Sequence, residues 1–459
     1  LPFASQDPDP SNEYFSDGFT EEVITDLSRL EGLRVIATGS SMQLKGIERD
    51  ARTLGRDLEC THVLRGSVRM VGFRLYAAAE LVEAATDAVI WASDFEGTLD
   101  DVFEIQDRLS LAVAEALGME ASPAERERIG ARPIPDVRAY DYYLQAREGS
   151  THLTDVSLRR ALEHLEEALE IVGENALLYA SMGDVHLYGA AVVPEERERH
   201  LDAAESFARR ALTVDPDCHR AYALLGMLQA DQGRMREGIA NLARAVELEP
   251  RNAETLGWAA QAHATVGLMD EAAEFARTLG RIDPLTPWSQ LVLGFVDMLS
   301  GHSDDAIANL KRAYRLSPTT PMFRLLYAFS LAFDGQREAA AHLLGDVDRV
   351  PGDVTAAFAH VLRHALLGEA DQAAACMTPE VERHARTDPQ FSWLVADCYG
   401  MLDERDSAAE WLENAARLGF INYPFFARKD PFLRPLRGDA RFDQALKAVR
   451  EAWEQLDVE

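Results

Sequence analysis

The chain has 459 residues, of which 47% are hydrophobic, and its 46 basic and 77 acidic side chains give a formal net charge of −31. This length suggests about three domains of ordinary size, and the apolar content excludes wholesale disorder. An acidic surface repels phosphate groups, so the charge argues against a protein that binds nucleic acid or anionic membranes.

The four cysteines are scattered: Cys60, Cys218, Cys376 and Cys398. Without a CxxC pair or neighbouring histidines, they fit neither a disulfide framework nor a zinc site, and a reducing, cytoplasmic setting is expected. No apolar run approaches the roughly 18 residues of a membrane span, and no signal peptide is visible. Position 1 already lies in what looks like a strand (1–3), so we expect further sequence upstream.

The first part of the chain shows the periodicity of strands mixed with helices. Alternating or continuous apolar stretches predict strands at 33–37, 62–70, 73–82 and 88–95. Helical patterns fall at 20–30, 48–58 and 102–117. Gly72 suits a tight hairpin between the second and third strands. We therefore predict a compact α+β domain with a mixed sheet over 1–120, and a linker over 121–136.

An acidic, proline-punctuated loop opens this domain with Asp7, Asp9, Glu13 and Asp17. Such a group of carboxylates could bind a cation. The same residues also suit turn formation and capping before the first helix, which is the interpretation the sequence favours.

The remainder of the chain contains an internal repeat with a period of 34 residues. The repeat shows first in glycines that are 34 residues apart, with a last step of 33: Gly233, Gly267, Gly301, Gly335 and Gly368. A small-residue series has the same spacing: Gly226, Ala260, Gly294 and Ala328. So does a proline series, again with a last step of 33: Pro216, Pro250, Pro284, Pro318 and Pro351. Three series with one period predict stacked repeats.

Each residue type has a mechanical role in a helical hairpin. A small residue in the middle of the first helix lets the second helix approach closely. Glycine at the end of that helix can adopt the left-handed conformation of a cap, and proline ends the second helix because it cannot continue it. Each repeat is therefore expected to be a helix, a tight turn, a second helix and a stop.

The repeats resemble the tetratricopeptide family over 137–419, which implies about eight helix pairs. The typical pattern appears as Tyr222, Leu225-Gly226, Ala245 and Pro250. Repeats at both ends deviate, as capping repeats do. We interpret 420–459 as an aromatic segment followed by a capping helix.

The N-terminal part resembles a TolB-like domain. The resemblance rests on several short stretches: Leu1-Pro2-Phe3, Glu13-Tyr14-Phe15, Val63-Leu64-Arg65-Gly66-Ser67-Val68-Arg69 and Val102-Phe103-Glu104-Ile105-Gln106-Asp107. In bacteria this domain typically precedes tetratricopeptide repeats and follows an output module, which is a class III adenylate cyclase, a protein kinase or a winged-helix DNA-binding domain. The signatures of those modules are not found in this sequence.

The chain carries none of the common catalytic motifs: no G-x-G-x-x-G, P-loop, H-E-x-x-H or G-x-S-x-G. His360 and His364 are four residues apart, a spacing that could share a metal, but no third ligand lies near them in sequence and an ordinary helix surface is favoured. We predict no catalytic residue, no metal site and no cofactor.

The first helices of the repeats predict a groove that turns from polar to aromatic. The polar part has Arg220, Ala223, Met227, Glu254, Gly257 and Gln261. The aromatic and methionine-rich part, the predicted partner-binding stripe, has Trp288, Leu291, Phe295, Met298, Met322, Leu325 and Phe329. Apolar patches of this kind often bind partners. The alternative is that another part of the chain covers the stripe.

The sequence therefore predicts a non-catalytic regulatory or interaction region that binds a protein or peptide through the solenoid. Two alternatives stay open. The first is a small-molecule sensor at the junction of the α+β domain and the first repeats. The second is a fragment of a cyclase or kinase whose catalytic domain lies upstream.

Overall fold

The computed structural model describes residues 1–7, 12–193, 196–345, 347 and 353–456. The chain divides into two compact units. Residues 1–224 and 282–284 form the first unit, and residues 225–281 and 285–459 form the second.

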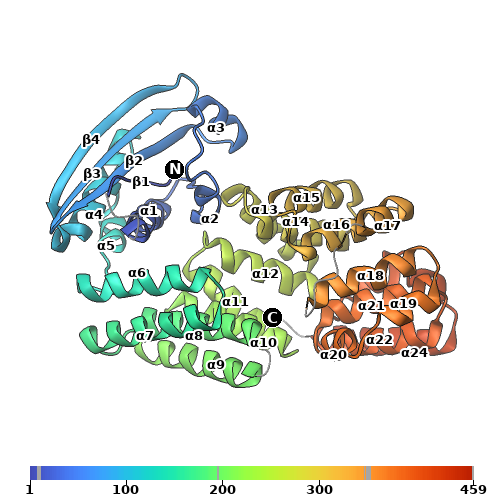
Figure 1. The fold of residues 1–459 in the computed structure, drawn as a ribbon. Coiled ribbons are helices and arrows are strands. Elements are labelled where there is room, and N and C mark those ends of the chain that lie inside the picture. The colour runs from blue at the N-terminus through green and yellow to red at the C-terminus, as the bar shows by residue number, and fades with distance from the viewer. Residues whose placement is uncertain (8–11, 194–195, 346, 348–352, 457–459) are drawn as a thin grey trace. The chain divides into compact units, whose positions relative to one another are not determined.

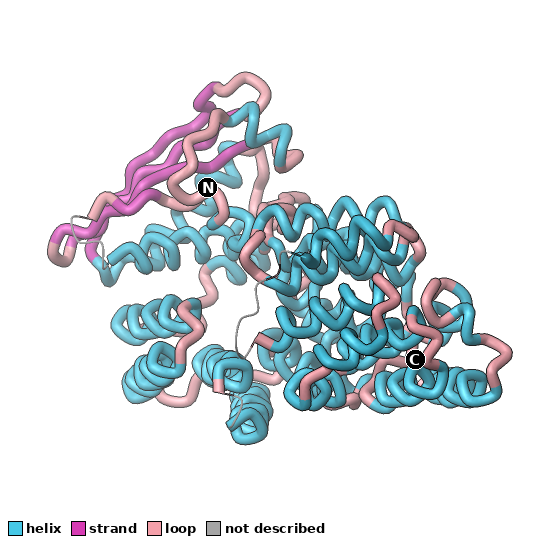
Figure 2. Tube along the Cα trace, turned by 45° about the vertical axis from the view of Figure 1, so that its right-hand side comes forward, coloured by secondary structure: helices cyan, strands magenta, loops and turns pink. Residues whose placement is uncertain are grey.

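One four-stranded sheet lies in the first unit (Figures 1 and 2). Its strands in spatial order are β1 (Ala4–Ser5), β2 (His62–Val71), β3 (Arg74–Glu83) and β4 (Ala88–Thr98). β1 pairs with β2 in parallel, whereas β2–β3 and β3–β4 are antiparallel hairpins. The sheet is therefore mixed, as predicted, and Gly72 makes the first tight turn with a positive φ of 63°.

Alternation along β3 creates the buried face of the sheet. Leu75, Ala77, Ala79 and Leu81 are all buried and lie on one face, because side chains two residues apart point the same way. The helices of this region are α1 (Glu13–Ser28), α2 (Thr38–Met42), α3 (Ala51–Asp57), α4 (Val102–Ala116) and α5 (Pro123–Ile129). Helices α1 and α4 contact the strands and form the core with them.

Two expectations for this region need correction. Residues 33–37 form no strand but lead directly into α2, and the Ala37 N–H donates to the Ile282 carbonyl at 2.7 Å instead of to a neighbouring strand. The predicted linker contains the helix α5, which begins with Ser122 as its cap and Pro123 in its first turn. The side chain of Ser122 accepts from the backbone N–H of Glu125, whose carboxylate accepts in return from the N–H of Ser122.

The rest of the described chain is helical and consists mainly of antiparallel pairs. The first unit contains α6 (Val137–Thr151), α7 (Asp155–Val172), α8 (Ala176–Val192) and α9 (Arg197–Val214). The next helices are α10 (His219–Asp231), α11 (Met235–Leu248), α12 (Ala253–Val266), α13 (Met269–Ile282), α14 (Pro287–Ser300) and α15 (Ser303–Leu316). They are followed by α16 (Pro321–Phe333), α17 (Arg337–Gly345), α18 (Val354–Leu366), α19 (Ala370–Cys376), α20 (Pro379–Thr387), α21 (Pro389–Met401) and α22 (Arg405–Arg417).

The repeat signals have the predicted structural roles. The glycine series from Gly233 to Gly368 has positive φ at every position, between 72° and 87°. In the small-residue series, a Cβ added to Gly294 would lie 2.5 Å from Leu310 Cγ of the partner helix. Only a small residue allows that approach, so the tetratricopeptide-type hairpin is confirmed. Pro351 of the proline series lies outside the described residues.

After α22 the chain forms α23 (Tyr423–Arg428) and α24 (Ala440–Glu454). Helix α24 packs against α22 and buries Phe442, Ala445 and Val449, which recur at helical spacing. The sequence suggested that the aromatic segment from residue 420 caps the end of the stack. In the structure, the stretch between α22 and α24 lies elsewhere, against the first helices of earlier repeats.

Candidate functional site

The first helices of the later repeats form a continuous surface in the second unit. Helix α12 contacts α14, α14 contacts α16, α16 contacts α18 and α18 contacts α21. We call the surface formed by these helices the first-helix face. The predicted partner-binding stripe lies on two of them, α14 and α16.

The aromatic part of this face is buried, which corrects the expectation of an open docking stripe. Leu291, Phe295, Met298, Leu325 and Phe329 are at most 6% exposed. The two remaining stripe residues, Trp288 and Met322, are half-buried.

The cover is a segment of the same chain, residues 420–433, which we call the C-terminal strap. Its Phe420 ring lies 6.5 Å from that of Phe295, and its Phe432 ring lies 5.9 Å from that of Phe329, measured between centroids. Each buried phenylalanine contributes about 1.5–3 kcal/mol through removal of apolar area from water. The stripe is therefore core, and its occupant is intramolecular.

Trp393 of α21 is the centre of this aromatic cluster. Its ring centroid lies 5.2 Å from that of Phe329, 5.3 Å from that of Phe420 and 5.5 Å from that of Phe425, all in edge-to-face geometry. Edge-to-face contacts between aromatic rings add to the energy of burial. Trp393 thus joins the first-helix face and the strap in one packed unit.

Polar contacts fix the path of the strap across the first-helix face. Asn422 Nδ2 donates to the carbonyl of Ala264 in α12 at 2.8 Å, and the Ile421 N–H donates to that of Thr265 at 3.2 Å. Further along, Lys429 Nζ donates to the carbonyl of Ser300 at the end of α14 at 2.8 Å. Helix C-termini leave carbonyls without intrahelical partners, and a cation is favoured there.

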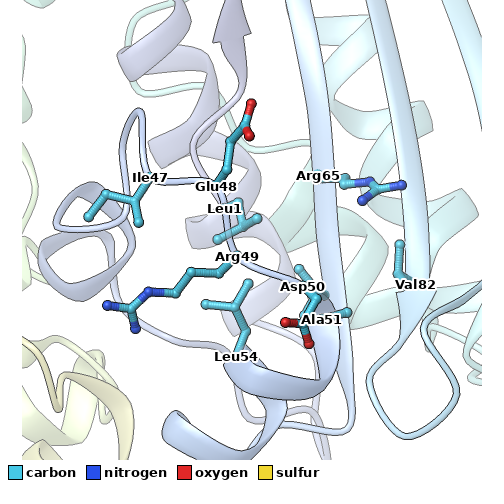
Figure 3. Close-up of a pocket in the computed structure, with 10 residues that line it drawn as sticks. Leu1, Ile47, Glu48, Arg49, Asp50, Ala51, Leu54, Arg65 and Val82 are labelled. Carbon is cyan, nitrogen blue, oxygen red and sulfur yellow. The ribbon is translucent and has the colours of Figure 1, made fainter.

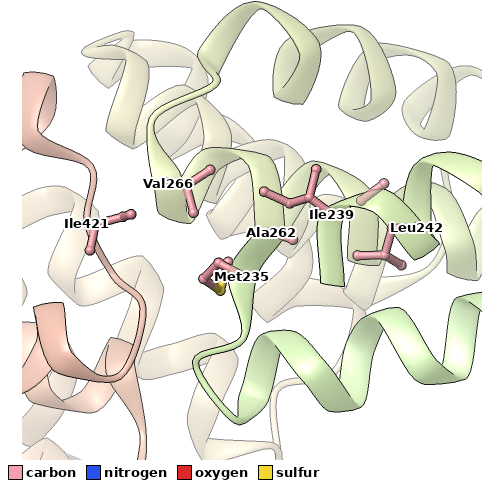
Figure 4. Packing of buried hydrophobic residues seen from close by; sticks show 7 residues of the cluster. Met235, Ile239, Leu242, Ala262, Val266 and Ile421 are labelled. Atoms are coloured by element: carbon pink, nitrogen blue, oxygen red, sulfur yellow. The ribbon is translucent and has the colours of Figure 1, made fainter. Parts of the chain in front are cut away.

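The start of the strap also joins an aliphatic cluster, shown in Figure 4. Ile421 lies beside Val266 of α12, and Met235 and Ile239 of α11 belong to the same buried group. These residues come from positions almost two hundred apart in sequence. The aromatic content of the strap was visible in the sequence, but no periodic signal there indicated which face it covers.

The first unit has a polar counterpart on the helices α6, α8 and α10. Arg220 Nη2 lies 2.6 Å from Asp184 Oδ2, and Arg220 Nη1 donates to Tyr143 Oη at 3.1 Å. Arg147 pairs with Glu21 of α1, and its guanidinium lies 5.8 Å from the Tyr143 ring centroid. We call Tyr143, Arg147, Asp184 and Arg220 the polar cluster.

The polar cluster is partly accessible. The side chain of Arg220 is 26% exposed and that of Asp184 is 17% exposed. Burial raises the pKa of Asp184, and the neighbouring Arg220 guanidinium offsets this only in part. A guanidinium held by a carboxylate and a phenol presents directed N–H donors, which suits recognition of carboxylates and backbone carbonyls.

The first unit also contains a pocket of about 480 Å³ (Figure 3). Its apolar wall includes Leu54, Val63 and Val82, and its polar wall includes Arg49 and Arg65. These residues come from the strands β2 and β3, the loop before α3, and α3 itself. The pocket lies inside the α+β region. The sequence-based hypothesis of a small-molecule sensor expected the ligand site at the junction of that region and the first repeats.

The remaining candidate residues have structural partners. His364 Nδ1 lies 2.6 Å from Glu369 Oε2, and Lys45 Nζ lies 2.7 Å from both Glu13 Oε1 and Asp17 Oδ1. Asp9 lies outside the described residues. Within the part of the chain that the structure describes, no group of three or more metal-ligating side chains is present. None of the described helices combines the length and hydropathy that a bilayer crossing requires.

Comparison with known proteins agrees with the repeat architecture. Residues 219–252 match the tetratricopeptide repeat family. A curated relative, the putative adenylate cyclase 3 of Rhizobium meliloti (strain 1021), is 35% identical over 187 residues, which are 41% of this chain and 32% of the relative. The chain thus spans about a third of the length of that relative.

Several solved structures share the helical-repeat fold. A thermophilic tetratricopeptide protein of Thermus thermophilus is 16% identical, with a TM-score of 0.35, over 42% of this chain and 99% of its own. A tetratricopeptide protein of Parabacteroides merdae ATCC 43184 is 14% identical, with a TM-score of 0.37, over 58% and 98%. PilF of Pseudomonas aeruginosa is 16% identical, with a TM-score of 0.35, over 46% and 96%.

Proposed function

We propose that this chain is a non-catalytic regulatory region of a bacterial signalling protein, which binds a protein or peptide partner through the first helices of its early repeats. The observation that carries the proposal is the polar cluster, where Arg220, Asp184 and Tyr143 form a partly exposed network on successive first helices. Tetratricopeptide solenoids generally use such extended helix surfaces for binding. The aromatic stripe is filled by the strap, so the polar cluster replaces it as the proposed site.

The signalling context is proposed from the relative. The similarity to a putative adenylate cyclase covers only part of each chain, and it supports a role beside a cyclase-type output module. A TolB-like assignment for residues 1–120 belongs to the same proposal, supported by the mixed sheet and its helices. A cytoplasmic location is supported by the free thiols of all four cysteines.

Removal of charge from the polar cluster tests the binding site. The double variant Asp184→Asn/Arg220→Gln removes both charges and leaves two polar side chains in their place. A matched control is Glu205→Gln/Arg209→Gln, which neutralises an ion pair of 2.7 Å on the second helix α9. In cross-linking mass spectrometry with extracts of the source cells, proteins captured by the wild type and the control should be lost from the cluster variant. Equal capture by both variants would contradict the proposed site.

Catalysis is tested separately. The purified chain, incubated with ATP and magnesium, should form no cyclic nucleotide and transfer no phosphate. Turnover that survives repurification would contradict the non-catalytic assignment.

A second candidate function is small-molecule sensing, because the first unit contains the pocket of about 480 Å³. Its lining combines an aliphatic wall with two arginines and the carboxylates of Glu48 and Asp50, and both arginines are ion-paired, Arg49 with Asp57 and Arg65 with Glu80. Such a mixed lining suits a small polar ligand with an apolar body. A library of such compounds should then raise the melting temperature of the wild type but not of Leu54→Trp, which fills the pocket. The absence of any stabilising ligand would remove this candidate.

A further inference from the structure

Two buried carboxyl groups meet where the strap crosses α21. Asp397 belongs to α21 and Asp430 to the strap, and both residues are 0% exposed. The second unit therefore places two acidic side chains in its core, at the contact that holds the strap on the first-helix face.

Asp430 has a complete set of donors for an ionised carboxylate. Its Oδ1 accepts the backbone N–H groups of Phe432 at 2.9 Å and Leu433 at 3.0 Å, and its Oδ2 accepts Trp393 Nε1–H at 3.1 Å. Three N–H donors stabilise the charged form.

Asp397 has the opposite surroundings. Neither of its carboxyl oxygens receives a hydrogen bond from an N–H or hydroxyl group among the described residues. Its carboxyl group interacts with that of Asp430 and lies near the Trp393 indole. Two ionised carboxylates cannot hydrogen-bond to each other, whereas one proton on Asp397 makes it a donor to Asp430.

The charged and titratable side chains on the adjoining elements have other contacts. Lys429 Nζ binds the Ser300 carbonyl, and the Arg337 guanidinium of α17 lies 5.6 Å from the Phe432 ring centroid. Arg434, next along the chain, is exposed. Cys398, beside Asp397 on α21, is buried, and burial raises the pKa of its thiol. The helix α16 contributes the apolar rings of Phe329 and Phe333. No cation forms an ion pair with either carboxyl group within the described residues.

We propose that Asp397 and Asp430 share one proton, and that loss of this proton releases the C-terminal strap from the first-helix face. In the protonated state the pair is a hydrogen bond between α21 and the strap. In the deprotonated state two negative charges lie together in an apolar core, which is strongly unfavourable. Release separates the charges and exposes the aromatic stripe, which then becomes available as an apolar surface.

Burial raises the pKa of both carboxyl groups, and the negative charge of Asp430 raises that of Asp397 further. An acid with a raised pKa in the folded state stabilises the fold most when it is protonated. Its contribution is complete below the ordinary pKa of an aspartate and is lost as the pH rises toward the raised value. The strap is therefore held most firmly at low pH, and it is released as the pH rises through the raised pKa of the pair.

Hydrogen exchange of the strap is the direct test. The amide N–H groups of Phe432 and Leu433 donate to Asp430, so their protection reports the contact itself. We expect protection of residues 420–433, corrected for base-catalysed exchange, to fall by at most about tenfold for each pH unit between the ordinary pKa of an aspartate and the raised pKa of the pair, and to level off above that pKa. In Asp397→Asn, whose amide donates to Asp430 at every pH, protection should not depend on pH. Protection of α15 should stay constant in both proteins, which separates release of the strap from global unfolding.

The matched control is Asp439→Asn, which changes a carboxyl group at the start of α24 that accepts the N–H groups of Arg441 and Phe442. Asparagine caps a helix equally well, so this variant should show the pH dependence of the wild type. The infrared spectrum of the wild type gives a check that needs no variant, because a buried protonated carboxyl group has its own C=O band. Absence of that band at every pH at which the wild type is folded, or a strap whose protection is independent of pH in the wild type, would overturn the proposal.

Discussion

The first helices of the two units carry different surfaces: that of the first unit is polar, and that of the second is apolar and covered. In the first unit, Arg220 and Asp184 pair on neighbouring first helices and stay partly exposed. In the second unit, Phe295 and Phe329 on the first helices α14 and α16 are buried by the strap. Charged positions can be satisfied in pairs and still face water, whereas an apolar stripe of this size is stable only when something covers it. The aromatic stripe, which the sequence suggested as the docking site, is thus the surface that the chain's own strap covers.

A histidine pair in the first unit and the carboxyl pair in the second have expected pH responses of opposite sign. Burial and the nearby His200 lower the pKa of His186 to about 4, which makes the histidine pair sensitive to acid. In the second, the buried carboxyl pair is sensitive to base. Substitutions in each unit can therefore separate the two behaviours.

The largest effect is expected for Phe295→Asp. The change leaves a cavity where the ring packed and places an unpaired charge in the core. We expect the free energy of unfolding of the second unit to fall by more than about 3 kcal/mol, measured by denaturant titration. Arg312→Ala on the exposed side of α15 should change it by less than about 0.5 kcal/mol. Near wild-type stability of Phe295→Asp would mean that the strap does not cover the stripe.

Gly294→Leu should have the next largest effect. An added Cβ already meets Leu310 Cγ at 2.5 Å, so a branched side chain forces α14 and α15 apart. Overpacking of this kind costs about 1–3 kcal/mol, observed as a lower melting temperature. Arg312→Leu adds the same side chain to the surface of α15 and serves as the control. Equal melting temperatures would contradict the close helix contact at this glycine.

Asp397→Asn should change how stability depends on pH. Between the ordinary pKa of an aspartate and the raised pKa, the folded wild type holds more protons than the unfolded chain, so its stability falls with rising pH. The difference between variant and wild type should grow by at most about 1.4 kcal/mol per pH unit in that interval. Denaturant titrations over a series of pH values measure this slope, and parallel curves for the two proteins would show that Asp397 does not titrate there.

The smallest effect is expected at the histidine pair of the first unit. His186 Nδ1 lies 3.0 Å from His200 Nδ1, and the pKa of His186 falls from 6.5 to about 4 mainly through burial. Below pH 6.5 the unfolded chain binds the proton that the folded chain refuses, so stability decreases as the pH falls toward 4. The ring is partly exposed, and solvent screening keeps the change small.

Between neutral and acid pH, the melting temperature of His186→Gln should fall less than that of the wild type. His302→Gln is the control, because the side chain of His302 is 64% exposed. If His186→Gln and His302→Gln respond identically to acid, the pair does not influence stability.

The parts of the fold that sequence predicts well are those set by local chemistry. The glycines from Gly233 to Gly368 need a positive φ, and Gly294 needs a close helix contact, so their spacing predicts the hairpins directly. Residues 33–37 have the apolar pattern of a strand, but a partner strand is a property of the whole sheet, and Ala37 bonds to the Ile282 carbonyl instead. The helix α5 was missed in the same way, although Ser122-Pro123 and Glu125 form a standard start signal.

The candidate site depends on contacts over long separations, which is why it was predicted only in part. The stripe residues lie on α14 and α16, but the burial of Phe295 and Phe329 depends on Phe420 and Phe432, each more than a hundred positions from its partner. The Asp397–Asp430 pair has no local pattern, because its two members are ordinary aspartates until the strap joins them. Similarly, Arg220 appeared in the polar part of the groove, but nothing near it indicated the pairing with Asp184.

The contacts of the strap also change how the second unit should unfold. In a simple helical-repeat stack each repeat touches only its neighbours, so repeats can detach one after another from an end. Here Asn422 binds a carbonyl of α12 that is 158 residues earlier, and this contact ties the last helix pairs to the first ones of the unit. Unfolding at the C-terminal end therefore also removes the cover from α12, α14 and α16. While the strap is bound, the helices of the unit should unfold together, and the unit should fold more slowly than an open stack because a long loop must close first.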